Sequence, residues 1–184
     1  MSDIAFPLHH SVDAVLPAGK PRELTIAPGQ EDLARIAEAY GLLGLRDLVA
    51  DLTLYPFRRD GVRVAGHLTA IATQACVVTL APVEQPIDET FEVRFDPSAR
   101  RMNEGDEIEI DALGEDPPEP LEGGRIDLGA VICEQFALAL DPFPKAPDAE
   151  VPEAYRPPEE GDEDPDDKPP SPFAKLAQLR KDKD

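Results

Sequence analysis

The chain has 184 residues, and its 38 acidic against 18 basic side chains give a formal net charge of -20. Such a charge repels phosphate on average, which excludes a broadly basic nucleic-acid-binding face and favours a basic protein partner. The hydrophobic share of 41% is enough for one folded domain, whereas two cysteines cannot form a disulfide framework or a cysteine metal site. We therefore expect no metal or other cofactor.

The beginning of the chain has neither the basic start nor the apolar stretch of a signal peptide. No apolar run approaches the length of about 18 residues that a membrane span needs. We expect a cytoplasmic protein that binds no membrane and no small-molecule substrate.

The first fifty residues predict a strand, a helix and a second approach to the sheet. Residues 1–20 indicate one strand and an irregular connector, and residues 22–27 alternate as an edge strand. Residues 31–40 carry apolar side chains on one helical face, and Gly41 is suited to the helix end. Residues 42–50 predict a loop that leads into a strand.

The clearest strand pair lies within residues 51–72. Asp60-Gly61 is a dipeptide suited to a two-residue hairpin turn between the two strands. On the returning strand His67 faces away from the apolar side, and the sequence places no carboxylate beside it. We therefore expect no catalytic role for this histidine.

Two further strands should follow the hairpin. Residues 73–80 predict one strand, residues 81–86 a turn, and residues 87–95 a half-buried antiparallel strand.

Residues 107–111 alternate apolar and acidic side chains, with Glu107, Glu109 and Asp111 on one strand face. One interpretation is a charged edge that prevents aggregation. The alternative is a metal-dependent hydrolase or an RNA-processing nuclease that uses this carboxylate face. The sequence shows no nucleophile–base pairing, no phosphate-binding loop and no His-Glu-x-x-His pattern, so the charged edge is favoured.

The segment from Leu121 to Lys145 predicts the central helix. Asp127 is a good N-cap, and Ile126 and Val131 occupy the positions of a hydrophobic staple. The helix should stop before Pro142. Four polar residues in and beside this helix are candidate contacts for a partner: Asp127, Glu134, Gln135 and Asp141.

The composition changes after this helix. Residues 147–167 hold ten acidic residues, five prolines and one arginine, so they cannot bury enough apolar surface to fold alone. Ser171-Pro172 then begins a short basic amphipathic segment that is suited to recognition. Its candidate contacts are Phe173, Leu176, Leu179, Arg180 and Lys181.

Together these patterns predict an α+β fold. We expect an antiparallel sheet of five to seven strands, open or closed into a barrel, with two packed helices in residues 1–145. A disordered acidic linker should occupy residues 146–170 and a short basic helix residues 171–184.

Four segments in this order resemble one bacterial family. They are TQACVVTLAPV, IDETFEVRF, IDLGAVICEQFALALDPFP and, after the acidic linker, PFAKLAQLR. The chain thereby resembles the YceD family, the large ribosomal RNA subunit accumulation proteins, over roughly residues 60–145 and 171–180. Many relatives carry a Cys-x-x-Cys pair where this chain has only Cys76, so we transfer no metal site and expect Cys76 and Cys133 to be small buried residues.

The resemblance implies a role in accumulation of 23S ribosomal RNA and in maturation of the large ribosomal subunit, in a family not known for enzymes. Combined with the charge, it predicts a non-enzymatic factor that docks a ribosomal protein or a large-subunit assembly factor. Contact with precursor ribosomal RNA would be indirect, because only the basic residues near the C-terminus are suited to it.

Overall fold

The computed structural model describes residues 6–16, 19–99, 117–121 and 123–150. Residues 1–149 form one unit, and residues 150–184 form a second. The strand expected at residues 107–111, residues 151–170 of the expected linker and the terminal helix of residues 171–184 lie outside the described residues. The first residues of the expected linker are described, and Ala149 is buried there.

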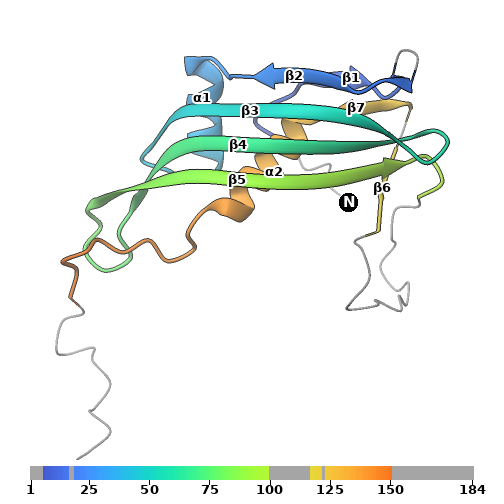
Figure 1. Cartoon of the computed structure of the whole chain (residues 1–184). Helices are drawn as coiled ribbons and strands as arrows, with labels where there is room; N and C mark the ends of the chain where they lie inside the picture. Colours follow the sequence, from blue (N-terminus) through green and yellow to red (C-terminus); the bar gives the residue numbers. More distant parts are fainter. Residues whose placement is uncertain (1–5, 17–18, 100–116, 122, 151–184) are drawn as a thin grey trace, which may run out of the picture. The chain divides into compact units, whose positions relative to one another are not determined.

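A five-stranded sheet is the largest element of secondary structure in the first unit (Figure 1). Its neighbours follow the order β2-β3-β4-β5-β6, and all pairs are antiparallel except β5 with β6. The strands are β2 (Arg22–Ile26), β3 (Gly44–Phe57), β4 (Gly61–Ala75), β5 (Pro82–Asp96) and β6 (Glu119–Pro120). Over the described strands this sheet is open, so the antiparallel α+β class is confirmed and no closed barrel is formed.

Two further short strands make a separate antiparallel pair, β1 (Ser11–Asp13) with β7 (Arg125–Asp127). The strand expected within residues 1–20 is therefore β1, at Ser11–Asp13. The sequence did not predict β7, which leads directly into the second helix.

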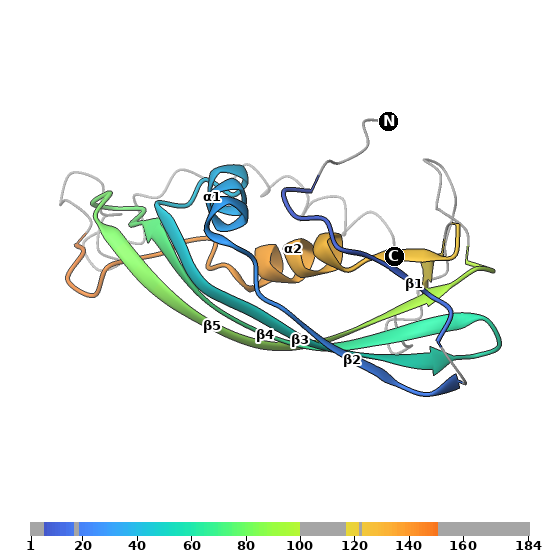
Figure 2. The same cartoon turned by 90° about the horizontal axis from the view of Figure 1, so that it is seen from above.

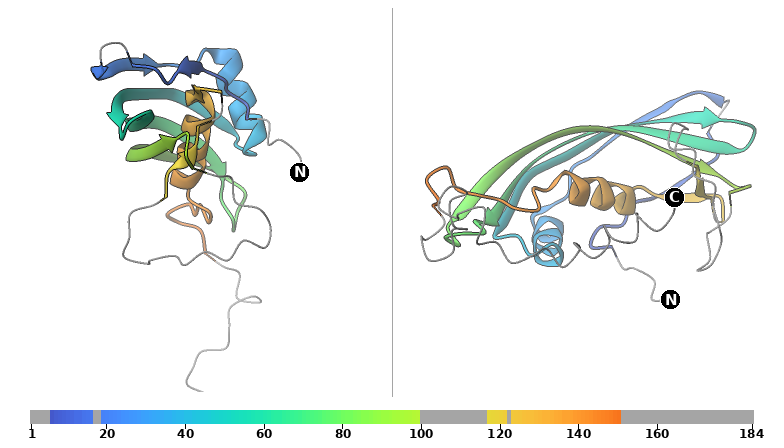
Figure 3. Two further views of the ribbon diagram at one scale, coloured as in Figure 1. Left: turned by 90° about the vertical axis from the view of Figure 1, so that its right-hand side faces the viewer. Right: turned by 90° about the horizontal axis from the view of Figure 1, so that it is seen from below.

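Both described helices, α1 (Gln30–Ala39) and α2 (Leu128–Ala139), lie on the concave side of the curved sheet (Figures 2 and 3). The convex side carries the outward-facing residues of β3, β4 and β5. The two predicted helices are confirmed, and the predicted edge position of β2 is confirmed as well.

The core lies between the helices and the concave face of the sheet. Its fully buried side chains alternate along the strands, as expected for a sheet with one covered face. They include Ile36, Leu52, Leu54, Val64, Leu68, Leu128, Ile132 and Phe136. Each such side chain contributes about 1.5–3 kcal/mol when it is removed from water.

The end of α1 follows from its glycine. Gly41 has a φ of 65°, and its N–H donates to the Glu38 carbonyl at 3.2 Å. The N–H of Leu42 reaches back to the Ala37 carbonyl at 2.8 Å. These two bonds form a Schellman motif, which confirms the predicted helix end.

The β3–β4 hairpin differs from the prediction in its turn. Phe57 is paired with Gly61, so the loop holds three residues, Arg58–Asp60, with Arg58 at a φ of 51°. Gly61 therefore belongs to the strand and not to the turn. A Cβ atom there would lie 2.5 Å from the Phe95 carbonyl oxygen, so the glycine allows the neighbouring backbones to approach.

The strand predicted at residues 73–80 and the turn predicted at residues 81–86 are both wrong. β4 continues to Ala75, and the turn follows, closed by a 2.8 Å bond from the Cys76 N–H to the Ala81 carbonyl. β5 begins at a proline, which lacks an N–H. This proline stands at the first residue of the strand, where a missing N–H is tolerated.

Candidate protein-docking surface

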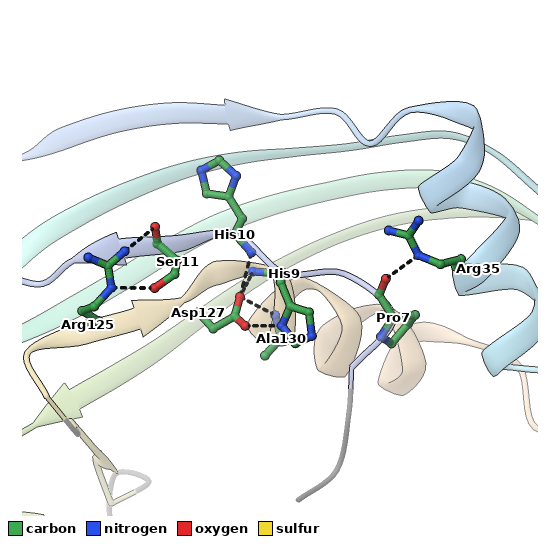
Figure 4. Close-up of polar contacts among 9 residues, drawn as sticks. Pro7, His9, His10, Ser11, Arg35, Arg125, Asp127 and Ala130 are labelled. Atoms are coloured by element: carbon green, nitrogen blue, oxygen red, sulfur yellow. Dashed lines mark hydrogen bonds and ion pairs between the residues drawn. The ribbon is translucent and has the colours of Figure 1, made fainter.

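The start of α2 is held by the carboxylate of Asp127 (Figure 4). Its Oδ1 accepts the N–H groups of Gly129 at 3.0 Å and Ala130 at 3.4 Å, which confirms the predicted N-cap. The same oxygen accepts the His10 N–H at 2.8 Å, and Oδ2 lies 2.6 Å from Nδ1 of His9. Asp127 therefore ties the N-terminal segment to the helix.

The surroundings of Asp127 change its acidity. Burial alone would raise the pKa of this carboxyl, but the hydrogen bonds from His9, His10 and Ala130 lower it below its ordinary value. The carboxylate is thus charged and already accepts several donors, so its first role is to organise the helix start.

Close backbone packing supports this junction. A Cβ atom at Gly129 would lie 2.6 Å from the carbonyl oxygen of Leu8 and 2.7 Å from the Cα of His9. Both are backbone atoms, so only glycine lets the N-terminal segment cross the first turn of α2.

The end of α2 is held by two glutamines of the sheet. Gln85 donates through Nε2 to the Ala139 carbonyl at 2.8 Å and accepts the Asp141 N–H through Oε1 at 3.0 Å. Gln74 donates to the Asp141 carbonyl at 3.0 Å. Asp141 in turn accepts the Phe143 N–H at 2.8 Å. The chain therefore leaves the helix along a defined path, which confirms the predicted stop.

Beside this exit several large apolar side chains are exposed. Five of the six large exposed apolar residues of the described chain lie at the β4–β5 turn or on segments hydrogen-bonded near it. We call this group the apolar end: Leu43, Val77, Leu80, Leu138 and Phe143. Backbone bonds join its segments, from Leu43 to Thr73 at 2.8 Å and from Val77 to Pro144 at 2.9 Å. Exposed apolar groups gathered in one place are typical of protein-interaction sites.

Carboxylates outnumber cations around the apolar end. Arg46 forms ion pairs with Asp47 at 3.0 Å and with Glu84 at 3.1 Å, so its charge is already matched. Asp141 adds a further exposed carboxylate and Lys145 a cation. The local surface therefore combines apolar groups with a small excess of negative charge.

Cys76 lies under the β4–β5 turn at this end. Its side chain is fully buried, as predicted, yet its sulfur is not in an apolar setting. Sγ accepts the N–H of Ala146 at 3.4 Å, that of Thr79 at 3.5 Å and that of Val78 at 3.4 Å. The bond from Ala146, with those from Thr79 and Val78, lowers the thiol pKa to about 6. Burial instead raises the pKa of Cys133.

The two other predicted helix contacts lie on α2 itself. Glu134 is exposed and Gln135 is half-buried. Loss of part of the hydration of the Glu134 carboxyl, with the negative charge of Glu119, raises its pKa. Both residues stay predictions for partner contact. The other predicted contacts, Phe173, Leu176, Leu179, Arg180 and Lys181, lie outside the described residues.

The carboxylate face of Glu107, Glu109 and Asp111 also lies outside the described residues. Within the described ranges, no group of three or more metal-ligating side chains is placed to hold an ion. The structure does add one pair that the sequence did not predict, since His67 Nε2 lies 2.6 Å from Asp88 Oδ1 on the exposed face. Among the described residues, no helix is long and apolar enough to cross a bilayer.

Comparison with known proteins identifies the family of this chain. The family model of the large ribosomal RNA subunit accumulation protein YceD matches residues 64–180, which is more than half of the chain. The chain belongs to the YceD family. The expected resemblance is thereby confirmed, and the family description links its members to the large ribosomal RNA subunit. Searches of curated proteins and of solved structures found no match.

Within this YceD family member, the match begins in β4 and extends through β5, β7 and α2. It therefore includes the two glutamines that hold the end of α2 and most of the apolar end. β1, β2, α1 and β3 lie outside the match.

Proposed function

We propose that this protein is a non-enzymatic factor in 23S ribosomal RNA accumulation and large-subunit maturation. It would act in the cytoplasm by docking a ribosomal protein or a large-subunit assembly factor. The family description supports the process, and the apolar end supports the mode of action.

The observation that carries the docking role is the exposure of Leu138 and Phe143. Leu138 is 80% exposed although it lies on a core helix, and Phe143 is 75% exposed between two prolines. Covering such a side chain contributes about 1.5–3 kcal/mol. The nearby carboxylates and the charge of -20 favour a partner segment that combines apolar and basic side chains.

The test replaces both apolar groups without disturbing the core. The Leu138→Ser/Phe143→Ser variant should fold, because neither side chain is buried, but it should fail to restore 23S ribosomal RNA in cells lacking the protein. The large-subunit protein or assembly factor that co-purifies with wild type should also be lost.

Val15→Ser is the matched control, since Val15 is 81% exposed but lies away from the apolar end. It should behave as wild type in both assays. Full restoration of ribosomal RNA by the double variant would contradict docking through this surface.

The terminal segment has a separate test. Deleting residues 171–184 removes all the predicted contacts from Phe173 to Lys181 and should weaken partner capture. Unchanged capture would remove this segment from the mechanism.

The non-enzymatic character is also open to a direct experiment. A Glu107→Ala/Glu109→Ala variant should restore ribosomal RNA as well as wild type does, because no catalytic use of these carboxylates is proposed. Loss of restoration by a folded variant would argue for the hydrolase or nuclease alternative.

A further inference from the structure

A second surface lies at the β3–β4 hairpin, at the opposite end of these strands from the apolar end (Figure 1). Four arginines and two aromatic residues gather there. We call this group the arginine corner: Tyr55, Phe57, Arg58, Arg59, Arg63 and Arg94. No local spacing in the sequence predicts it, because the residues come from three strands and one turn.

The strand register brings like charges together. Tyr55 is paired with Arg63, and Arg63 is paired with Arg94, so the three residues form one row across β3, β4 and β5. Directly opposed like charges destabilise a sheet. Glu92 offsets this by binding Arg63 at 2.8 Å and Arg94 at 3.1 Å. Hydrogen bonds from Arg63 and then Arg94 lower the Glu92 pKa, so it remains charged.

The guanidinium groups also lie over aromatic rings. The Cζ atom of Arg63 is 4.4 Å from the centre of the Tyr55 ring. Phe57 has Arg58 at 5.0 Å and Arg94 at 5.9 Å from its ring centre. These contacts hold planar cations in place, with donors spread around their edges.

Among the described residues, the outward charge of the corner is positive. Arg59 is 96% exposed and lies 4.0 Å from the exposed carboxylate of Asp60, which is a weak ion pair. Arg58 is 60% exposed, whereas the side chain of Asp96, which binds Arg58 at 3.0 Å, is only 7% exposed. Asp96 is further turned inward by accepting the Ser98 hydroxyl at 2.6 Å. A ligand at the surface therefore meets the cations before this buried carboxylate.

The net charge of -20 does not cancel this local field. At physiological ionic strength, exposed charges more than about 8 Å apart are largely screened from each other. A bound polymer therefore responds to the nearest charges, and the total charge mainly slows its approach. The sequence predicted that only the cations near the C-terminus are suited to RNA contact. The exposed cations of the arginine corner are an exception to that prediction.

We propose that the arginine corner binds single-stranded RNA. Arg58 and Arg59 would donate to backbone phosphates, and a base would stack on the Arg63 guanidinium that Tyr55 supports. RNA is favoured over an acidic peptide because the corner offers stacking planes as well as charge, and because the family is linked to ribosomal RNA. The proposal concerns a surface separate from the apolar end and does not depend on it.

The test is fluorescence anisotropy of a short labelled single-stranded RNA with the full chain, in a salt series that includes physiological ionic strength, where distant charges are screened. Arg58→Ala/Arg59→Ala should weaken binding at least about fivefold and reduce the salt slope by about 0.7 for each phosphate that is no longer neutralised. The control, Arg35→Ala/Arg46→Ala, removes the same charge from two arginines that are 56% and 51% exposed elsewhere, and it should change little. Equal weakening by the control would overturn the site.

Three further variants protect the result from a folding artefact. Arg59→Ala alone, which removes an almost fully exposed side chain, should still weaken binding, and Arg63→Lys should weaken it while leaving the salt slope unchanged. Leu138→Ser/Phe143→Ser should bind RNA as wild type does. No binding by wild type, or competition by polyglutamate as strong as by unlabelled RNA, would overturn the proposal.

Discussion

Gln85 accepts a hydrogen bond from the backbone N–H of Asp141 at 3.0 Å, so a side chain of the sheet selects the residue at which the chain leaves α2. The side-chain amide of Gln85 also donates to the carbonyl of Ala139, the last residue of that helix. The free carbonyl of a helix end is thereby satisfied by a residue more than fifty positions earlier. This clamp holds the helix end against β5 and directs the chain toward Phe143, whose neighbour Pro144 accepts the N–H of Val77 in the β4–β5 turn.

Replacing Gln85 should loosen this clamp. Gln85→Ala removes two hydrogen bonds and should lower the free energy of unfolding by about 1–3 kcal/mol. Urea unfolding followed by circular dichroism measures this. Thr90→Ala, on the exposed face of the same strand, should change it by no more than about 0.5 kcal/mol. An equal loss in both variants would show that Gln85 has no special role.

Gly129→Ala offers a test in which helix propensity and close packing predict opposite changes in the free energy of unfolding. Helix propensity alone predicts stabilisation by about 1 kcal/mol, because alanine is the better helix former. The backbone of Leu8, 2.6 Å from the new Cβ, instead predicts destabilisation by about 1–3 kcal/mol. Gly44→Ala is the control, since its nearest neighbour would be Thr73 at 3.6 Å, an ordinary contact. Stabilisation by Gly129→Ala would contradict the close crossing of the N-terminal segment.

Asp127 should make the free energy of unfolding depend on pH in the acidic range. Its folded pKa is lowered, so its contribution is fully present above the unfolded value of about 3.9 and is lost as pH falls through the folded pKa. Asp127→Ala should cost about 0.5–2 kcal/mol at pH 7 through the lost cap. The difference from wild type should shrink on acidification below about pH 4. A difference that stays constant down to pH 2 would contradict a charged cap.

Cys76 should titrate near neutral pH. Because its folded pKa is lowered to about 6, its contribution to stability is fully present above the unfolded value and is lost as pH falls through 6. The ultraviolet absorbance of the thiolate should therefore rise with a midpoint of about 6. Cys76→Ser should abolish this step and Cys133→Ser should retain it. A wild-type midpoint at the ordinary thiol value would contradict the three N–H donors.

Local signals in the sequence predicted several elements correctly. Gly41 marked the end of α1, Asp127 the start of α2 and Pro142 its stop, since caps and breakers act within a few residues. The alternation of β5 between Ile87 and Phe95 was also visible in the sequence. For these elements the determining contacts lie close together in the chain.

Other features depend on partners that are distant in sequence. The β4–β5 turn contains no glycine or proline, and its backbone is held by the Cys76 sulfur, so the pattern indicated a continuing strand. The exposure of Leu138 depends on which elements cover α2. The row of Tyr55, Arg63 and Arg94 depends on the register of three strands. None of these is encoded by a local spacing.

β4 has a consequence for how two macromolecules could be held together. It is a single strand of 15 residues, with the arginine corner beginning at one end and the apolar end at the other. At about 3.3 Å per residue, the path along this curved strand between the two surfaces is roughly 45 Å long. The strand thus acts as a rigid spacer, and a protein and an RNA bound at its ends would be kept at a set separation without touching each other.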